Sequence, residues 1–243
     1  MKVLIVGTAV AVLFAPVGAA LGVATLVSPT AARSVSCLNV GAAVDSPTGI
    51  SAGSVTLVAA VPQSLTAVNT HGETITLTHR QLQRAAAIIA TGTAEHVPAR
   101  GQLIALMAAL TESSLRVLSN TGAYPGSTGI PNDGNGSDHD SLGLFQMRPA
   151  AGWGTIAELM DPVWSSRAFY GGPVGPNHGS PRGLLDIPSW ETLAPGAAAQ
   201  AVEVSAYPDR YAVNQPVATA ILTTSTAAPT EPSPGPTPTP TAQ

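Results

Sequence analysis

Charged and aromatic side chains are scarce in this sequence. Of its 243 residues, 10% are charged and 4% are aromatic, and the formal net charge is -4. A protein that follows a phosphate backbone needs a basic surface, and 10 lysines and arginines against 14 acidic residues do not supply one. We therefore expect no nucleic-acid partner.

Cysteine is nearly absent as well. Cys37 is the only cysteine, so no intrachain disulfide can form. Neither a Cys-x-x-Cys zinc site nor a catalytic thiol fits the part of the chain that we expect to fold. The fold must therefore rest on an apolar core, and we expect no cofactor and no metal.

A long uncharged stretch lies near the start of the sequence. Residues 3–32 carry no charge, residues 3–27 are almost wholly apolar, and Lys2 precedes them. This pattern is typical of a secretory signal or of an N-terminal membrane anchor. Pro16 and a loose small-residue cleavage site leave both interpretations open. Residues 1–32 are thus interpreted as a signal peptide or an anchor, and we expect export to the cell envelope.

Two segments of biased composition flank the part that we expect to fold. Residues 33–73 are rich in Ser, Ala, Gly, Thr and Val, which predicts a spacer with one short strand near residues 55–61. Residues 223–243 hold six prolines among Thr, Ser and Ala, a composition that cannot bury a core. We predict a disordered tail there and a single domain over residues 74–222.

Helix signals begin sharply at Thr78. Its side chain can cap a helix, and Gln81 stands at the position that completes a capping box. The sequence therefore predicts a helix from Thr78 to about Ala90, with Gly92 as its stop.

A second helix is predicted to open at Pro98, since proline suits a first helical turn, and to end near Leu115. One apolar stripe runs along it, formed by Leu103, Leu106, Met107 and Leu110. Shorter helices are expected at residues 155–160, 162–170, 195–206 and 208–222. The predicted fold is therefore mainly α.

Glu112 is a lone carboxylate at the end of this second helix, with Arg116 as the nearest basic residue. Burial at an apolar helix end would raise the pKa of such a group. A carboxylic acid that stays protonated near neutral pH can donate a proton to the leaving oxygen of a glycosidic bond. The plainer alternative is a helix-end glutamate that faces solvent.

A second segment favours the catalytic interpretation. After a loop rich in Gly, Pro and Asp at residues 122–140, the chain reads Asp-Ser-Leu-Gly-Leu-Phe-Gln at residues 140–146. Together with the pair Glu112-Ser113, this segment resembles the lysozyme-like superfamily of lytic transglycosylases and goose-type lysozymes. The catalytic motif of that superfamily is a Glu-Ser pair at a helix end, followed by a Ser-x-Gly-Leu-(Met/Phe)-Gln segment.

Within that superfamily, the sequence most resembles cell-wall hydrolase domains of actinobacteria. Beyond residues 140–146, the resemblance rests on four short segments. They are Gly-Trp-Gly-Thr at 152–155, Leu-Met-Asp-Pro at 159–162, Ala-Phe-Tyr at 168–170 and Ser-Ala-Tyr-Pro-Asp at 205–209. The resemblance covers about residues 74–222 and implies a lysozyme-like helical domain.

The resemblance also implies roles for individual residues. Glu112 would be the general acid and later the base, and Ser113 a packing or orienting residue at the helix end. Five further positions would bind substrate in a cleft: Ser141, Gly143, Phe145, Gln146 and Tyr207. Trp153 would either stack on a sugar or anchor the core.

These implications predict a lytic transglycosylase that cleaves the β-1,4 bond between N-acetylmuramic acid and N-acetylglucosamine in peptidoglycan glycan strands. One carboxylate suffices, because the C6 hydroxyl of the muramic acid can attack and leave a 1,6-anhydro product. Cell-wall or secretion-apparatus proteins are candidate partners, and the membrane is another if residues 1–32 are retained.

Two alternatives stay open. A hydrolytic muramidase would use water and a second carboxylate, for which Asp133, Asp138 and Asp140 are available. A non-catalytic peptidoglycan-binding or scaffold domain would keep the fold without turnover. Residues 138–140, Asp-His-Asp, could also offer metal ligands, but alternate residues in a polar loop seldom converge on one ion.

Overall fold

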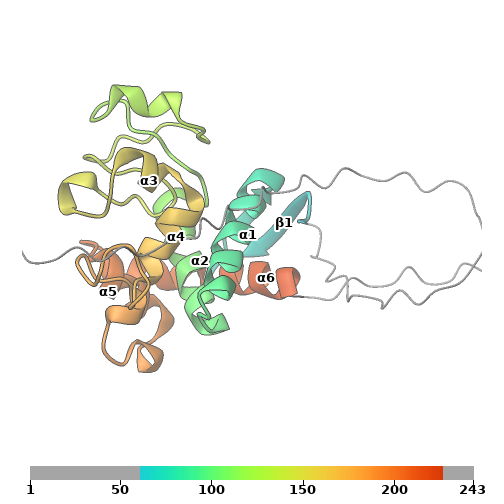
Figure 1. The fold of residues 1–243 in the computed structure, drawn as a ribbon. Helices are drawn as coiled ribbons and strands as arrows, with labels where there is room; N and C mark the ends of the chain where they lie inside the picture. Colours follow the sequence, from blue (N-terminus) through green and yellow to red (C-terminus); the bar gives the residue numbers. More distant parts are fainter. Residues whose placement is uncertain (1–60, 227–243) are drawn as a thin grey trace, which may run out of the picture. The chain divides into compact units, whose positions relative to one another are not determined.

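The computed structural model describes residues 61–226 of the chain, and all structural statements below concern this part (Figure 1). The predicted signal or anchor at residues 1–32 lies outside the described residues. So do most of the predicted spacer and most of the predicted tail. Within residues 61–226, no helix is long and apolar enough to cross a bilayer.

A small antiparallel hairpin opens the described part. Strands β1 (Ser64–Val68) and β2 (Thr74–Thr78) pair with Ser64 opposite Thr78 and Val68 opposite Thr74. Side chains alternate along both strands, so that apolar residues such as Leu77 face the core and threonines face outward. The first strand of the hairpin lies within the predicted spacer, so the folded part begins earlier than the predicted residue 74. The strand predicted near residues 55–61 lies almost wholly outside the described residues.

Helix α1 (His79–Ala94) begins as predicted, because Thr78 and Gln81 form a complete capping box. The prediction that Gly92 stops this helix is wrong, since α1 continues to Ala94. Gly92 serves packing instead. A Cβ atom at this position would lie 2.8 Å from the Tyr170 hydroxyl, so the missing side chain lets helix α4 (Pro162–Tyr170) approach α1 closely.

Helix α2 (Ala99–Ser113) is the central element (Figure 1). It contacts α1, α4, α5 (Pro195–Glu203), α6 (Gln215–Thr226) and the 3₁₀ segment η5 (Pro208–Asn214). Because neighbours surround it, almost every residue from 101 to 110 is buried. The helix is therefore buried on most of its faces, and not only along the single apolar stripe that the sequence predicted. The core of the unit forms around α2.

The remaining helices are short. Helices α3 (Ile156–Met160) and α4 match the predicted positions, each with a side-chain cap, from Thr155 and Asp161 respectively. The helix predicted at 208–222 is instead two elements, η5 followed by α6, and α6 extends into the predicted tail. Single 3₁₀ turns lie at Pro125–Gly129, Pro149–Ala151, Leu184–Asp186 and Trp190–Thr192. The described part is thus mainly helical, with one two-stranded sheet.

Candidate active site

Glu112 lies in the last turn of α2. The helix ends at the next residue, because the residues that follow adopt a left-handed backbone conformation. Ser114 and Leu115 both adopt positive φ angles, 54° and 58°, and the Leu115 amide donates to the Ala109 carbonyl. Left-handed backbone at residues other than glycine is uncommon, and here it turns the chain away from the helix axis directly after Ser113. The position of Glu112 is therefore fixed by the most buried helix of the unit.

Two side chains of η5 hold the Glu112 carboxylate. The Tyr211 hydroxyl donates a hydrogen bond of 2.5 Å to Oε1, and Arg210 Nη2 donates to Oε2 at 3.3 Å. The same Arg210 nitrogen also donates to the Thr111 carbonyl at 3.1 Å. The Glu112 side chain is only 13% exposed, and each of its two oxygens has a protein donor.

The surroundings of Glu112 act on its pKa in opposite directions. Burial, the largest effect, raises the pKa above its ordinary value. The hydrogen bond from Tyr211 and the charge of Arg210 lower the pKa, and the charge of Asp138 raises it again. The net result is a raised pKa, the direction that a general acid requires at neutral pH. Burial also raises the pKa of Tyr211, so this phenol remains a hydrogen-bond donor.

The second motif segment is attached to the end of α2. Ser113 Oγ donates to the Leu144 carbonyl at 2.7 Å, which joins the Glu-Ser pair to residues 141–147. A tight turn in this segment pairs Leu142 with Met147, and the Gly143 amide donates to the Leu118 carbonyl at 2.9 Å. The structure therefore brings together two motif segments separated by the long loop.

Gly143 is required by packing inside the protein. Its φ is +75°, and a Cβ atom on it would lie 1.9 Å from the carbonyl oxygen of Leu159, the neighbour of the last residue of α3. At this glycine, the close approach is made by the backbone of α3. Its role in holding substrate stays a prediction.

The other predicted binding residues are placed very differently from one another. Ser141 is 4% exposed, and Phe145 is 1% exposed with its ring stacked on Phe169 at 4.7 Å between centroids. Phe145 therefore lies in the core and does not present a wall to a ligand. Tyr207 lies at the opposite extreme, 71% exposed, and it is Tyr211, four residues later, that contacts Glu112.

Gln146 is half-buried and lines a cavity of about 340 Å³. Its backbone has a positive φ of 49°, and its Nε2 donates to the Gly143 carbonyl at 3.0 Å. The cavity is also lined by Arg148, Trp153, Arg182 and Glu203. Trp153 is half-buried at the edge of the core and lines the same cavity.

Glu203 is a second carboxyl group of this site that sequence reasoning missed. It is the last residue of α5, and its Oε1 is shielded from solvent without a hydrogen-bond partner in the described part of the chain. Burial raises its pKa well above the ordinary value, the charge of Glu112 adds to the rise, and Arg210 opposes it. No short motif marks Glu203, because the helix end that carries it meets α2 only in the folded chain.

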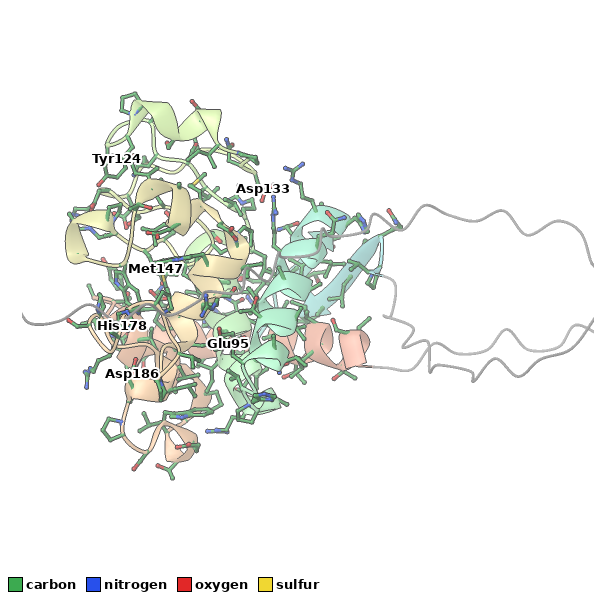
Figure 2. All side chains as sticks on the ribbon, in the orientation of Figure 1. Glu95, Tyr124, Asp133, Met147, His178 and Asp186 are labelled. Carbon is green, nitrogen blue, oxygen red and sulfur yellow. The ribbon has the colours of Figure 1, made fainter. Side chains whose placement is uncertain are left out.

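The three aspartates of the 122–140 loop have distinct surroundings. Asp133 forms ion pairs with Arg80 and Arg84 of α1, and Figure 2 shows it between the loop and that helix. Asp140 pairs with Arg148 and accepts the Ala150 amide. These two carboxylates are engaged in holding the fold.

Asp138 is the loop aspartate whose charge acts on Glu112. It is exposed and pairs with His139 at 2.7 Å. Asp140, two residues later, pairs with Arg148, so residues 138–140 do not converge on one point. Among residues 61–226, no group of three or more His, Cys, Asp or Glu side chains is arranged to hold a metal ion.

Comparison of the chain with models of protein families and with curated proteins finds no match.

Proposed function

We propose that this protein is a peptidoglycan-cleaving lytic transglycosylase with a lysozyme-like fold, in which Glu112 is the catalytic acid. The observation that carries the proposal is the state of Glu112: a largely buried carboxyl with a raised pKa, at the end of α2 and joined through Ser113 to the turn at residues 141–147. Protonated carboxyl groups in such surroundings are suited to glycosidic bond cleavage.

In the proposed reaction, protonated Glu112 donates its proton to the glycosidic oxygen while the bond from that oxygen to C1 of the N-acetylmuramic acid breaks. The C6 hydroxyl of the same sugar then attacks C1. Glu112, now a carboxylate, takes the proton from this hydroxyl, so the enzyme returns to its starting state and the product carries a 1,6-anhydro ring. No second protein nucleophile takes part.

Tyr211 and Arg210 have a defined role in this sequence of steps. Both donate hydrogen bonds to Glu112 and therefore favour its charged form, which exists between proton donation and proton return. Burial has the opposite effect and favours the protonated form. The balance between these effects keeps the proton of Glu112 transferable in both directions.

A hydrolytic muramidase is the second candidate, and Asp138 is the observation that favours it. This exposed carboxylate lies on the loop and acts on the pKa of Glu112, so it is available to activate a water molecule. A non-catalytic wall-binding domain is the third candidate.

Export through residues 1–32, location at the cell envelope and contacts with cell-wall or secretion-apparatus proteins belong to the same proposal. They rest on the uncharged stretch of the sequence and on the nature of the proposed substrate, which lies outside the cytoplasmic membrane.

Digestion of purified peptidoglycan by the full-length chain tests the proposal, with mass spectrometry of the released muropeptides. We expect anhydro-muropeptides from the wild type and a decrease of about 100-fold or more in Glu112→Gln, since general acid catalysis contributes on this scale. Glu191→Gln is the matched control, because Glu191 is exposed on a separate 3₁₀ turn.

If the wild type instead releases products with hydrated reducing ends, and Glu112→Gln does not, the protein is a muramidase and not a transglycosylase. Binding to peptidoglycan without any release, in a protein with a normal circular dichroism spectrum, would favour the non-catalytic domain. Release that is equal in wild type and Glu112→Gln would contradict the role of Glu112 in either enzyme.

A further inference from the structure

The backbone of Val204 is strained. This residue ends α5 with a φ of 51° and a ψ of 40°, which lies in the left-handed region. In that region the Cβ atom of any residue other than glycine comes close to the following carbonyl oxygen, and a β-branched side chain is the least suited to it. Among residues 61–226, Val204 is the only β-branched residue with a positive φ. The folded state is therefore destabilised at this position.

The side chain of Val204 does not compensate for this strain by packing. It is 77% exposed, which is the highest value among the large apolar side chains of the described part. A buried side chain can offset backbone strain through the apolar area that it removes from water, but an exposed one cannot. Glycine is the residue that most often ends a helix in this conformation, and it would avoid both costs. Neither the helix end nor the core accounts for a valine here.

Hydrogen bonds hold the loop that Val204 begins. The Val204 amide donates to the Gln200 carbonyl at 2.8 Å, and Gln200 Nε2 donates to the Ser205 carbonyl at 2.8 Å. The Tyr207 amide donates to Ser205 Oγ at 3.2 Å. These bonds connect the loop, residues 204–207, to α5 and to itself. The exposed side chain of Val204 is thus kept at a defined place on the surface.

That place is the wall of a cavity in the candidate active site. Val204 lines the cavity of about 340 Å³ that Gln146 and Trp153 also line. The residue before it, Glu203, lies close enough to Glu112 for the charge of one to act on the other. The segment that holds the Glu112 carboxylate, η5, begins directly after the loop. An exposed apolar group therefore stands beside the proposed proton donor.

A sugar ring matches the groups that line this cavity. Its C–H groups form an apolar face and its hydroxyl groups form a polar rim. Val204 and Trp153 supply apolar surface, and Gln146 and Arg182 supply hydrogen-bonding groups. A ring that packs on Val204 would remove the exposed side chain from water, which stabilises the complex by the means that the free protein lacks. Strained residues of this kind are found most often at binding and catalytic sites.

We propose that Val204 is a substrate-contacting residue, whose side chain packs against a sugar ring of the glycan strand in the cavity beside Glu112. This inference rests on the proposed function, since it names a residue that sets how tightly the same site holds its glycan. Stability of the free protein is lower than it could be at this position, and affinity for the glycan is higher.

The test measures two properties of each variant: its melting temperature and its affinity for soluble, peptide-free glycan strands of alternating N-acetylglucosamine and N-acetylmuramic acid. Affinity is measured by calorimetry with the full-length chain carrying Glu112→Gln, so that the strands stay uncut. Val204→Gly and Val204→Asn enter the left-handed region readily and lose the apolar side chain, whereas Val204→Ile keeps it. Two exposed controls lie elsewhere: Ser189→Gly relieves a φ of 56°, and Val163→Ala trims a valine of α4.

We expect stability and affinity to change in opposite directions. Val204→Gly should melt about 2–4 °C higher than its parent, because the strain is gone, and Val204→Asn should also melt higher. Both should bind the strands about 5-fold more weakly, as for the loss of one apolar contact. Val204→Ile and the two controls should bind like the parent. A purely structural role of Val204 would not combine a gain in stability with a loss of affinity.

Several results would overturn the inference. They are unchanged affinity in Val204→Gly and Val204→Asn, equal losses in Val204→Ile, a lower melting temperature in Val204→Gly, or strands that bind to no variant. Weaker self-association of Val204→Asn in analytical ultracentrifugation, with glycan affinity unchanged, would show that the loop contacts a second copy of the chain instead.

Failure of the proposed function gives a different pattern. If glycan affinity depends on Val204 while the wild type releases nothing from peptidoglycan, the domain binds glycan strands without cleaving them. If the wild type digests peptidoglycan and the Val204 variants bind normally, the proposed function stands and only the inference fails.

Discussion

Tyr211 donates a 2.5 Å hydrogen bond to Oε1 of Glu112 across 99 positions of the sequence. The bond links the end of α2 to η5, and Arg210 adds a second link between the same two elements. The charge of the candidate catalytic residue therefore depends on a segment that lies near the end of the described chain.

Replacing Tyr211 by phenylalanine should change the pH dependence of the proposed activity. The hydroxyl lowers the pKa of Glu112, so its loss should raise that pKa and move the alkaline limb of the pH–rate profile to higher pH. The maximal rate should fall about 10-fold, because the Glu112 carboxylate loses a charge-assisted hydrogen bond. Clearance of a peptidoglycan suspension between pH 4 and 9 measures both effects. Glu191→Gln, at an exposed position on a separate 3₁₀ turn, should change neither, and a shift in that control would contradict the assignment.

Alanine at Gly143 should destabilise the fold strongly. The added Cβ would meet the Leu159 carbonyl at 1.9 Å, and the positive φ angle adds strain. We expect a loss of at least ~2 kcal/mol in the free energy of unfolding, measured by urea denaturation. Gly126→Ala is the matched control, since no atom lies within 4 Å of its added Cβ. Equal stability of both variants would contradict this expectation and show that the turn at residues 141–147 can shift to accommodate the added methyl group.

Asp133→Asn should loosen the 122–140 loop from α1. The Asp133 carboxylate accepts bonds from Arg84 and Arg80 and from the Val117 amide, and its side chain is buried. Arg80 is largely exposed and Arg84 partly so, and we therefore expect the loss of these bonds to the charged carboxylate to destabilise the protein by about 1.5–3 kcal/mol. Thermal unfolding should show this loss at pH 7, with the exposed Asp209→Asn as control.

The effect of Asp133→Asn should also depend on pH. Burial raises the pKa of Asp133, but the bonds from Arg84, Val117 and Arg80 outweigh it and lower the pKa below the ordinary value of 3.8. A carboxyl group with a lowered pKa stabilises the fold at pH values above its ordinary pKa. This stabilisation is lost as the pH falls through the pKa of the group in the folded protein. The difference between wild type and variant should therefore shrink in acid, and a constant difference down to pH 2 would contradict this account.

Glu203→Gln should stabilise the protein at neutral and alkaline pH. Burial and the charge of Glu112 raise the pKa of Glu203 above the ordinary value of 4.5. A carboxyl with a raised pKa contributes its stabilisation below 4.5, and this contribution is lost as the pH rises through the folded value. The melting temperature of the wild type should accordingly decline with rising pH relative to Glu203→Gln. A variant that is less stable than wild type at pH 8 would identify Glu203 as a structural residue.

Local signals in the sequence predicted the helices well. The capping box of Thr78 and Gln81 and the cap of α3 each lie within four residues, so the sequence contains all the information that starts these helices. Gly92 misled the prediction because its role depends on Tyr170, which approaches from another helix. The 3₁₀ geometry of η5 was missed for a similar reason, since its contacts with α2 and α5 form only in the folded chain.

The candidate site was predicted in part. Glu112 could be singled out because it is a lone carboxylate at the end of an apolar helix, and Gln146 because of the segment around it. Tyr211, Arg210 and Glu203 are separated from Glu112 by at least 91 positions and belong to no local pattern, so only the folded chain identifies them. Tyr207 lies in the same segment as Tyr211 and is exposed, and its role in binding substrate stays a prediction.

The pairing of the first and last elements has a practical consequence. Helix α6 contacts β1, and Val61 and Ser225 line the same groove, so the described chain enters and leaves the unit at one place (Figure 1). Units with adjacent termini tolerate circular permutation and insertion into the surface loops of other proteins. Residues 61–226 should therefore fold when they are inserted into a surface loop of another protein, or when their two ends are joined by a short linker in a circular permutant.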